Sequence, residues 1–117
     1  MYTHCTSVPR LHIVTVATEE AFYLPYLRAS CRHHGQELIV LGMGKQTQWQ
    51  GLTTKFRWML KFLRPLPRDD LVCFVDGYDV ICTRDLSELP AEFNALCAQQ
   101  GGDVVVAHNL YPRPWMH

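Results

Sequence analysis

The sequence lacks the short motifs that most directly reveal nucleotide, metal or redox chemistry. It has no G-x-G-x-x-G or G-x-x-x-x-G-K-[ST] string, and the nearest stretch, from Gly42 to Lys45, has neither spacing. Its six histidines show no H-x-x-x-H spacing, and its five cysteines form no C-x-x-C pair. Dinucleotide-binding, P-loop, zinc and thioredoxin-like sites are therefore not predicted.

An excess of one charge and a long apolar run are also missing. Eleven basic residues balance eleven acidic ones, so the chain has no broad positive field to attract nucleic acid or an anionic membrane. No apolar run approaches the length of a transmembrane helix. We expect no nucleic-acid partner and no membrane span, and any anion must be held locally by a few residues.

The first ten residues have no apolar segment of the kind found in a signal peptide, so the chain as written is expected to be cytoplasmic. The odd number of cysteines agrees weakly with a reducing compartment, because one thiol would stay unpaired in an oxidising one. We interpret most of them as small core residues. At 117 residues the chain fits a single domain over 1–117, short for an enzyme with two large substrates and therefore expected to be truncated.

Apolar β-branched runs alternate with helical patterns along the chain. The predicted strands cover 11–18, 37–41, 70–75 and 103–107. The predicted helices cover 20–34, with Phe22, Tyr26 and Ala29 at helical spacing, then a segment from Thr53 or Thr54 to the prolines at 65 and 67, and 87–100. The order β-α-β-α-β-α-β predicts an α/β fold with a Rossmann-like, mainly parallel sheet and helices on both faces.

Three details of these helices are open to test. Thr18 and Ser87 are expected to cap the first and third helices, and Thr53 or Thr54 the second. Pro25 lies late for a first turn and is expected to kink its helix. In the second helix a buried stripe is predicted from the spacing of Phe56, Met59, Leu60 and Leu63.

Two aspartates follow the third predicted strand, in the string Asp76-Gly77-Tyr78-Asp79. Ligands of open α/β sheets bind beyond the carboxyl ends of the strands, which places both carboxylates where a ligand is expected. Mg²⁺ and Mn²⁺ bind one or two carboxylates and complete their shell with water and phosphate oxygens. The pair therefore predicts a site for a dication bound to a diphosphate, although aspartates at strand ends also form ordinary turn hydrogen bonds.

The string from Phe74 to Ile81 resembles the metal-binding segment of the glycosyltransferase domain in procollagen lysyl hydroxylases and their relatives. Ile13 to Thr18 is similar to that family's first strand, Lys55 to Trp58 to the helix after its glycine-rich loop, and Asp69 to Val72 to the approach to the metal strand. The resemblance spans Leu11 to Trp115 and is most specific over Asp69 to Ile81.

This resemblance implies a GT-A fold, a UDP-sugar donor, a Mn²⁺ (or Mg²⁺) ion and transfer of galactose or glucose to a collagen-like hydroxylysine acceptor. It implies the endoplasmic reticulum lumen if the chain is a fragment of a family member. By matching position, Asp76 and Asp79 are the metal ligands. The donor would be contacted by Val16 and Thr18 at the end of the first strand and by Lys55, which would face the diphosphate. Trp58 would help to form the wall of the nucleotide pocket, and Tyr78 would lie close to the uridine.

The departures from the family leave alternatives open. Ala107 to Pro112 replaces an acidic residue and a Trp-Pro, and the histidine that completes the family's metal shell would lie beyond His117. His108 and His117 are weak substitutes. A noncatalytic module that retains only nucleotide-sugar binding is the second hypothesis. An aspartate-nucleophile phosphatase ranks last, because it needs an aspartate two positions after the first. From pattern alone, Lys55 and Trp58 also fit a solvated lysine and a core tryptophan.

Overall fold

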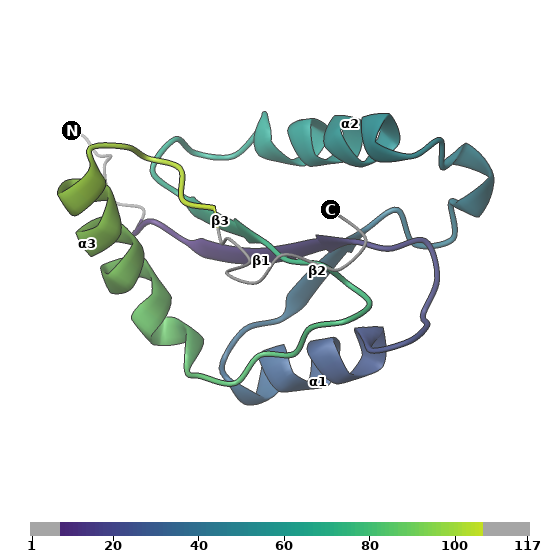
Figure 1. Cartoon of the computed structure of the whole chain (residues 1–117), viewed down its shortest axis with the longest axis horizontal. Helices are drawn as coiled ribbons and strands as arrows, with labels where there is room; N and C mark the ends of the chain where they lie inside the picture. The colour runs from purple at the N-terminus through teal and green to yellow at the C-terminus, as the bar shows by residue number, and fades with distance from the viewer. Residues whose placement is uncertain (1–7, 107–117) are drawn as a thin grey trace, which may run out of the picture. The chain divides into compact units, whose positions relative to one another are not determined.

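A computed structural model of the chain describes residues 8–106, which form an α/β fold (Figure 1). Its internal contacts divide the chain into two compact units, with the boundary between Ser87 and Glu88. The first unit contains the sheet and two helices, and the second contains one helix. They are described separately below.

The sheet of the first unit has three parallel strands in the order β2-β1-β3. They are β1 (Leu11–Val16), β2 (Leu38–Leu41) and β3 (Leu71–Phe74). The central β1 pairs Ile13 with Leu38 on one side and Leu11 with Leu71 on the other. Three of the four predicted strands are thus confirmed, with ends one or two residues shorter than the sequence indicates.

Two helices cover the sheet from opposite faces (Figure 1). The helix α1 (Leu24–His33) connects β1 to β2, and α2 (Leu52–Leu63) connects β2 to β3. The buried apolar core comes from the sheet, the segment after β1 and α1, and consists of Ile13, Val14, Ala17, Leu24, Leu27, Cys31 and Leu38. This arrangement confirms the predicted α/β class with a parallel sheet and helices on both faces.

The helix α1 begins later than the predicted residue 20, and Thr18 does not cap it. Its N-cap is Tyr23, which makes no side-chain capping bond, and Pro25 lies in the first turn. A proline is tolerated there because the first helical N–H groups have no partner within the helix. Pro25 therefore marks the start of α1 and does not kink its middle.

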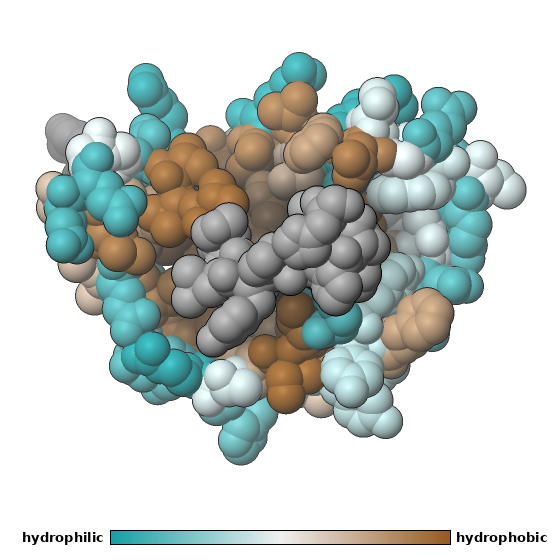
Figure 2. All heavy atoms as spheres, viewed as in Figure 1, coloured by the Kyte–Doolittle hydropathy of each residue, from teal (hydrophilic) through white to brown (hydrophobic). Residues whose placement is uncertain are grey.

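The helix α2 differs from prediction at its cap and on its outer face. Its N-cap is Gly51, with φ of 91°, and the buried Thr54 accepts a hydrogen bond from the Gln50 N–H at 2.9 Å. The predicted buried stripe is wrong, because Phe56 and Leu60 are 54% and 52% exposed. Hydrophobic residues appear among hydrophilic ones where α2 lies at the top of Figure 2.

The physical reason is that α2 carries apolar residues on two sides. Phe62, outside the predicted stripe, lies against the His12 ring of β1 with centroids 5.9 Å apart. Periodicity shows that residues share a helical face, but it does not show which face meets the sheet when both are apolar. The contacts in the folded chain decide it.

The second unit contains α3 (Leu89–Gln100), whose N-cap is Glu88 and whose C-terminal residue is followed by Gly101 in the left-handed conformation. A short 3₁₀ turn (Leu86–Glu88) precedes it, so Ser87 does not cap the α-helix. Residues 103–106 form no strand, and Val104 and Val106 are exposed. The fourth predicted strand is therefore absent over 103–106, and Ala107 lies outside the described residues. An apolar run favours extended backbone, but a strand also needs a neighbour to pair its N–H and C=O groups.

The described cysteines are free thiols, and their burial varies. Cys31 is buried in the core, and this burial, with Cys82 close by, raises the pKa of its thiol to about 11. The prediction of a small core residue is confirmed for Cys31, whereas Cys73, Cys82 and Cys97 are only partly buried.

A polar contact joins the N-terminal ends of β1 and β3. It lies at the edge of the sheet opposite the carboxyl ends of the strands. The Asp70 carboxylate lies 2.8 Å from the His12 ring nitrogen and accepts the Arg10 N–H at 3.0 Å, and its side chain is only 5% exposed. The hydrogen bond with His12 and then that with Arg10 hold the pKa of Asp70 below its ordinary value of 3.8. Asp70 therefore stabilises the fold as a carboxylate.

Replacing Asp70 with asparagine should lower the melting temperature at neutral pH. The pKa of Asp70 is lower in the folded protein than its ordinary value of 3.8, which the unfolded chain keeps. The contribution of the Asp70 carboxylate to stability is therefore fully present above pH 3.8 and is lost as the pH falls through the folded-state pKa. The Asp70→Asn variant should lack that part of the acid-induced loss of stability. Thermal melts between pH 3 and 7 measure this. Asp69→Asn, an exposed neighbour, is the control, and equal melting curves for both variants would contradict the assignment.

Candidate functional site

The segments that follow the three strands converge at the carboxyl edge of the sheet. The Thr18 carbonyl, after β1, accepts a hydrogen bond from the Gly44 N–H, after β2, at 2.8 Å. The Thr18 N–H donates to the Tyr78 hydroxyl, after β3, at 3.2 Å. Because ligands of parallel sheets bind at this edge, the convergence locates the candidate site.

The turn after β3 lies directly against β1. The buried Thr15 hydroxyl donates a hydrogen bond of 2.7 Å to the Val75 carbonyl, just before Asp76. A Cβ atom on the buried Gly77 would lie 2.8 Å from the Thr15 hydroxyl oxygen, closer than real Cβ contacts. Only glycine fits here, so this close contact fixes the turn that carries Asp76 and Asp79.

Asp76 and Asp79 both lie in exposed positions on this turn. Asp76 forms an ion pair with the half-buried Lys55 of α2, with Nζ 3.6 Å from the carboxylate oxygen. Asp79 has no ion-pair partner among residues 8–106. Across the same residues no group of three or more His, Cys, Asp or Glu side chains gathers to hold a metal. The charged groups of this turn and its ion pair are thus two carboxylates, Asp76 and Asp79, and one cation, Lys55.

Tyr78, between the two aspartates, is tied to the segment after β1. Its hydroxyl accepts hydrogen bonds from the Thr18 and Glu19 N–H groups at 3.2 and 3.4 Å and donates to the Glu19 carbonyl at 3.3 Å. Its own carbonyl accepts the Tyr23 N–H at 3.2 Å. Tyr78 therefore holds the aspartate turn and the β1–α1 connection together.

Trp58 of α2 packs onto the backbone after β2. A Cβ atom on Gly42, where φ is 91°, would lie only 2.2 Å from the Trp58 ring, so the indole occupies the space that a side chain would need. Trp49 lies beside it, with ring centroids 5.9 Å apart, after a 3₁₀ turn (Gln46–Gln48). The two indoles form an aromatic wall one helical turn from Lys55.

The structure therefore brings four of the predicted residues together through direct contacts. Tyr78 and Thr18 share a hydrogen bond, and Lys55 and Asp76 form an ion pair. Val16 is partly buried at the end of β1, and Trp58 faces Gly42. Lys55 differs from Arg57 and Lys61 of the same helix, which are exposed. Of these three residues, Lys55 is the one that forms an ion pair at this edge of the sheet.

The contact of Phe22 with this site is not predicted by the sequence. Its ring lies edge-on to Tyr78, with centroids 5.5 Å apart, and its backbone φ is 52°. Helical spacing had placed Phe22 inside the first helix, and no sequence pattern marks a non-glycine residue with positive φ. His108, His117 and the segment from Ala107 to Pro112 lie outside the described residues.

Comparison with known proteins gives two findings. The family described as "PLOD GT domain" matches residues 7–112. The "Multifunctional procollagen lysine hydroxylase and glycosyltransferase" of Caenorhabditis elegans is 30% identical over 103 residues, which cover 78% of this chain and 14% of the relative. The chain thus spans a small part of the length of this curated relative.

Substituting alanine for Gly77 should destabilise the first unit. The added methyl group must displace Thr15 or the turn, and overpacking of this kind typically costs about 1–3 kcal/mol. Chemical denaturation measures the change in the free energy of unfolding. Gly102→Ala is the matched control, since nothing lies within 4 Å of the position that its added methyl group would take. Equal stabilities of the two variants would show that the turn does not press on β1.

Proposed function

We propose that this chain, which belongs to the PLOD GT domain family, is the donor-binding part of a metal-dependent glycosyltransferase. The transferred group is a hexose from a UDP-sugar, and the acceptor is a hydroxyl group of the hydroxylysine type or another hydroxyl. The observation that carries the proposal is the ion pair of Lys55 with Asp76 beside Tyr78, at the edge where three strand ends converge.

Asp76 and Asp79 suit a hard dication, Mn²⁺ or Mg²⁺. Both are carboxylates, both are exposed, and Asp79 has no competing cation among the described residues. Such an ion binds few protein oxygens and uses phosphate oxygens for the rest of its shell, so two ligands are compatible with it. Bound there, the dication would act as a Lewis acid that stabilises charge on the departing diphosphate.

Lys55 would leave its ion pair with Asp76 and bind the same diphosphate. At 3.6 Å and partly exposed, its contact with Asp76 is a weak, solvent-screened ion pair that costs little to break. A diphosphate held by the dication places negative oxygens where the lysine can reach them. Lys55 also lies in the first turn of α2, whose free N–H groups favour anions.

The remaining donor contacts follow the strand ends. Val16 ends the central strand, Thr18 lies just beyond it, and Trp58 walls the space over Gly42. An indole offers a large flat apolar surface, which suits the sugar or base of the donor. Tyr78 lies between the two aspartates in the sequence, and by the family resemblance it would lie close to the uridine.

A collagen-type acceptor and the endoplasmic reticulum lumen are part of the proposal. They rest on the similar Caenorhabditis elegans protein, whose name states that it modifies procollagen lysine. None of the helices in residues 8–106 is long and apolar enough to cross a membrane.

A noncatalytic nucleotide-sugar-binding module is the second candidate. It is favoured by the ligand set of the described residues, in which no group of three or more His, Cys, Asp or Glu side chains gathers to hold a metal. The two candidates share the donor site and differ in turnover.

Binding of UDP should depend on Mn²⁺, because the dication links the carboxylates to the diphosphate. Loss of a residue that merely supports a metal ligand costs about 10–100-fold in affinity, so Asp76→Asn or Asp79→Asn should weaken UDP binding at least that much. Calorimetric titrations with Mn²⁺ and with a chelator measure this. Asp69→Asn, at the opposite end of β3, is the control. Equal affinity with and without Mn²⁺ would remove the metal from the proposal.

Hydrolysis or transfer of UDP-galactose and UDP-glucose separates the enzyme from the noncatalytic module. An enzyme should release UDP at a rate that falls in Asp76→Asn and is unchanged in Asp69→Asn. Release of UDP at the buffer rate, together with Mn²⁺-dependent UDP binding, would establish the noncatalytic module.

A further inference from the structure

Phe22 has an unfavourable backbone conformation. Its φ of 52° is the one positive value among the non-glycine residues that the structure describes. The left-handed region brings Cβ close to the backbone carbonyl oxygen, so bulky residues rarely occupy it. Strain of this kind persists only where the surrounding structure imposes it, and it concentrates at functional sites.

The Phe22 ring lies outside the buried core. The residue is 74% exposed, whereas the adjacent core contacts of α1 come from the fully buried Leu24 and from Leu27. The ring contact of Phe22 is with Tyr78, at an interplanar angle of 72°. A small residue would satisfy the core and, as glycine or asparagine, would also suit the backbone.

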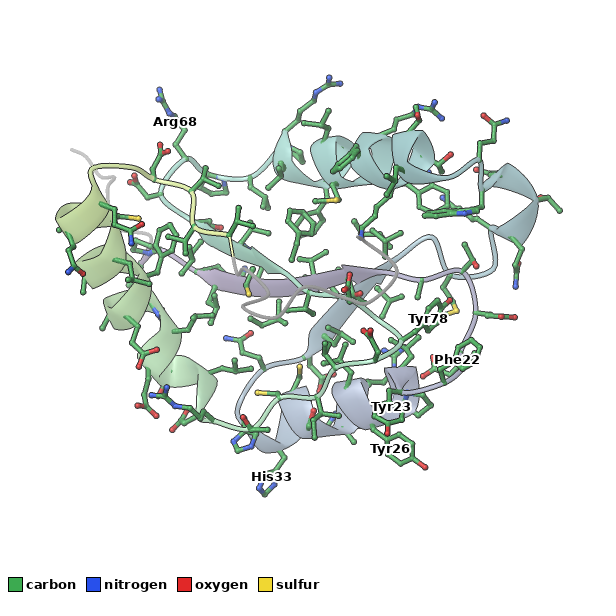
Figure 3. All side chains as sticks on the ribbon, in the orientation of Figure 1. Phe22, Tyr23, Tyr26, His33, Arg68 and Tyr78 are labelled. Atoms are coloured by element: carbon green, nitrogen blue, oxygen red, sulfur yellow. The ribbon has the colours of Figure 1, made fainter. Side chains whose placement is uncertain are left out.

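The partner ring of Tyr78 is held firmly. Three hydrogen bonds fix its hydroxyl to the backbone of Thr18 and Glu19, and the Tyr23 N–H fixes its carbonyl. Figure 3 shows Phe22 and Tyr78 next to each other, beyond the start of α1. The strained backbone thus places an exposed ring against an immobilised one at the edge of the candidate site.

We propose that Phe22 is a nucleobase-binding residue, which together with Tyr78 forms an aromatic platform for the pyrimidine base of the donor. The proposal rests on the proposed function and adds a residue to it. An edge-to-face pair leaves ring faces open, and any planar base can stack on such a face. Tyr78 lies between Asp76 and Asp79 in the sequence, so a base on this platform would lie on the same turn as the carboxylates proposed for the diphosphate.

The neighbouring exposed tyrosines do not show the same combination. Tyr23 and Tyr26 contact each other edge-to-face, with centroids 5.8 Å apart. Tyr23 is the N-cap of α1, Tyr26 lies within this helix, and neither has a positive φ. Exposure alone therefore does not distinguish Phe22; the strain and the contact with Tyr78 do.

Three Phe22 variants separate the ring from the backbone. Phe22→Asn removes the ring and tolerates the left-handed conformation, Phe22→Gly removes both ring and strain, and Phe22→Tyr keeps the ring. Calorimetry with Mn²⁺ present should show UDP binding about tenfold weaker in the first two, near the lower end of the range for base stacking, and unchanged in Phe22→Tyr. Binding of inorganic pyrophosphate with Mn²⁺ should stay the same in all, and the melting temperature should not fall in Phe22→Asn.

Tyr26→Ala is the matched control: an exposed aromatic residue close by that does not contact Tyr78, and it should bind UDP like wild type. Wild-type UDP affinity in Phe22→Asn, or equal loss of UDP and pyrophosphate binding with a lower melting temperature, would overturn the proposal. If wild type binds UDP no more tightly than pyrophosphate, the base platform is wrong and the metal site stands. If it binds neither in the presence of Mn²⁺, the proposed function fails and the platform with it.

Discussion

The site depends on the close packing of the turn after β3 against the central strand. Thr15 is buried, its hydroxyl donates to the Val75 carbonyl, and it leaves no space for a side chain at Gly77. A parallel sheet aligns strand ends at one edge, but it does not by itself fix the loops beyond them. Here one hydroxyl and one glycine hold the turn, so its two carboxylates stay exposed at the edge of a rigid strand.

Tyr78 extends this constraint to the rest of the site. Its hydroxyl binds the backbone after β1, and the Thr18 carbonyl binds the backbone after β2, so the three connections form one hydrogen-bonded set. The charges at this edge do not balance, because Lys55 offsets Asp76 while Asp79 stays without an ionic partner among the described residues. The proposed donor complex, a dication that brings its own anionic ligand, would use this unbalanced pair of carboxylates.

Sequence and structure diverge where local pattern leaves more than one solution. The spacing of Phe56 and Leu60 predicts a shared face, and they do share one, but it is exposed because Phe62 takes the side toward His12. Pro25 fits a helix start as well as a kink, and only the folded chain, with Tyr23 as the N-cap, shows that α1 begins at Leu24. The apolar run at 103–106 favours extended backbone but acquires no pairing partner.

The sequence by itself determined the α/β class, the three parallel strands and the position of Asp76 and Asp79 at a strand end, because alternation and apolar runs are local properties of the chain. Only the tertiary structure decided that Lys55 meets Asp76, that Tyr78 bonds the backbone after β1, and that Phe22 has a positive φ against Tyr78. Each of these joins residues from different strand connections. Their meeting depends on strand order and loop packing, and no spacing along the sequence encodes that directly.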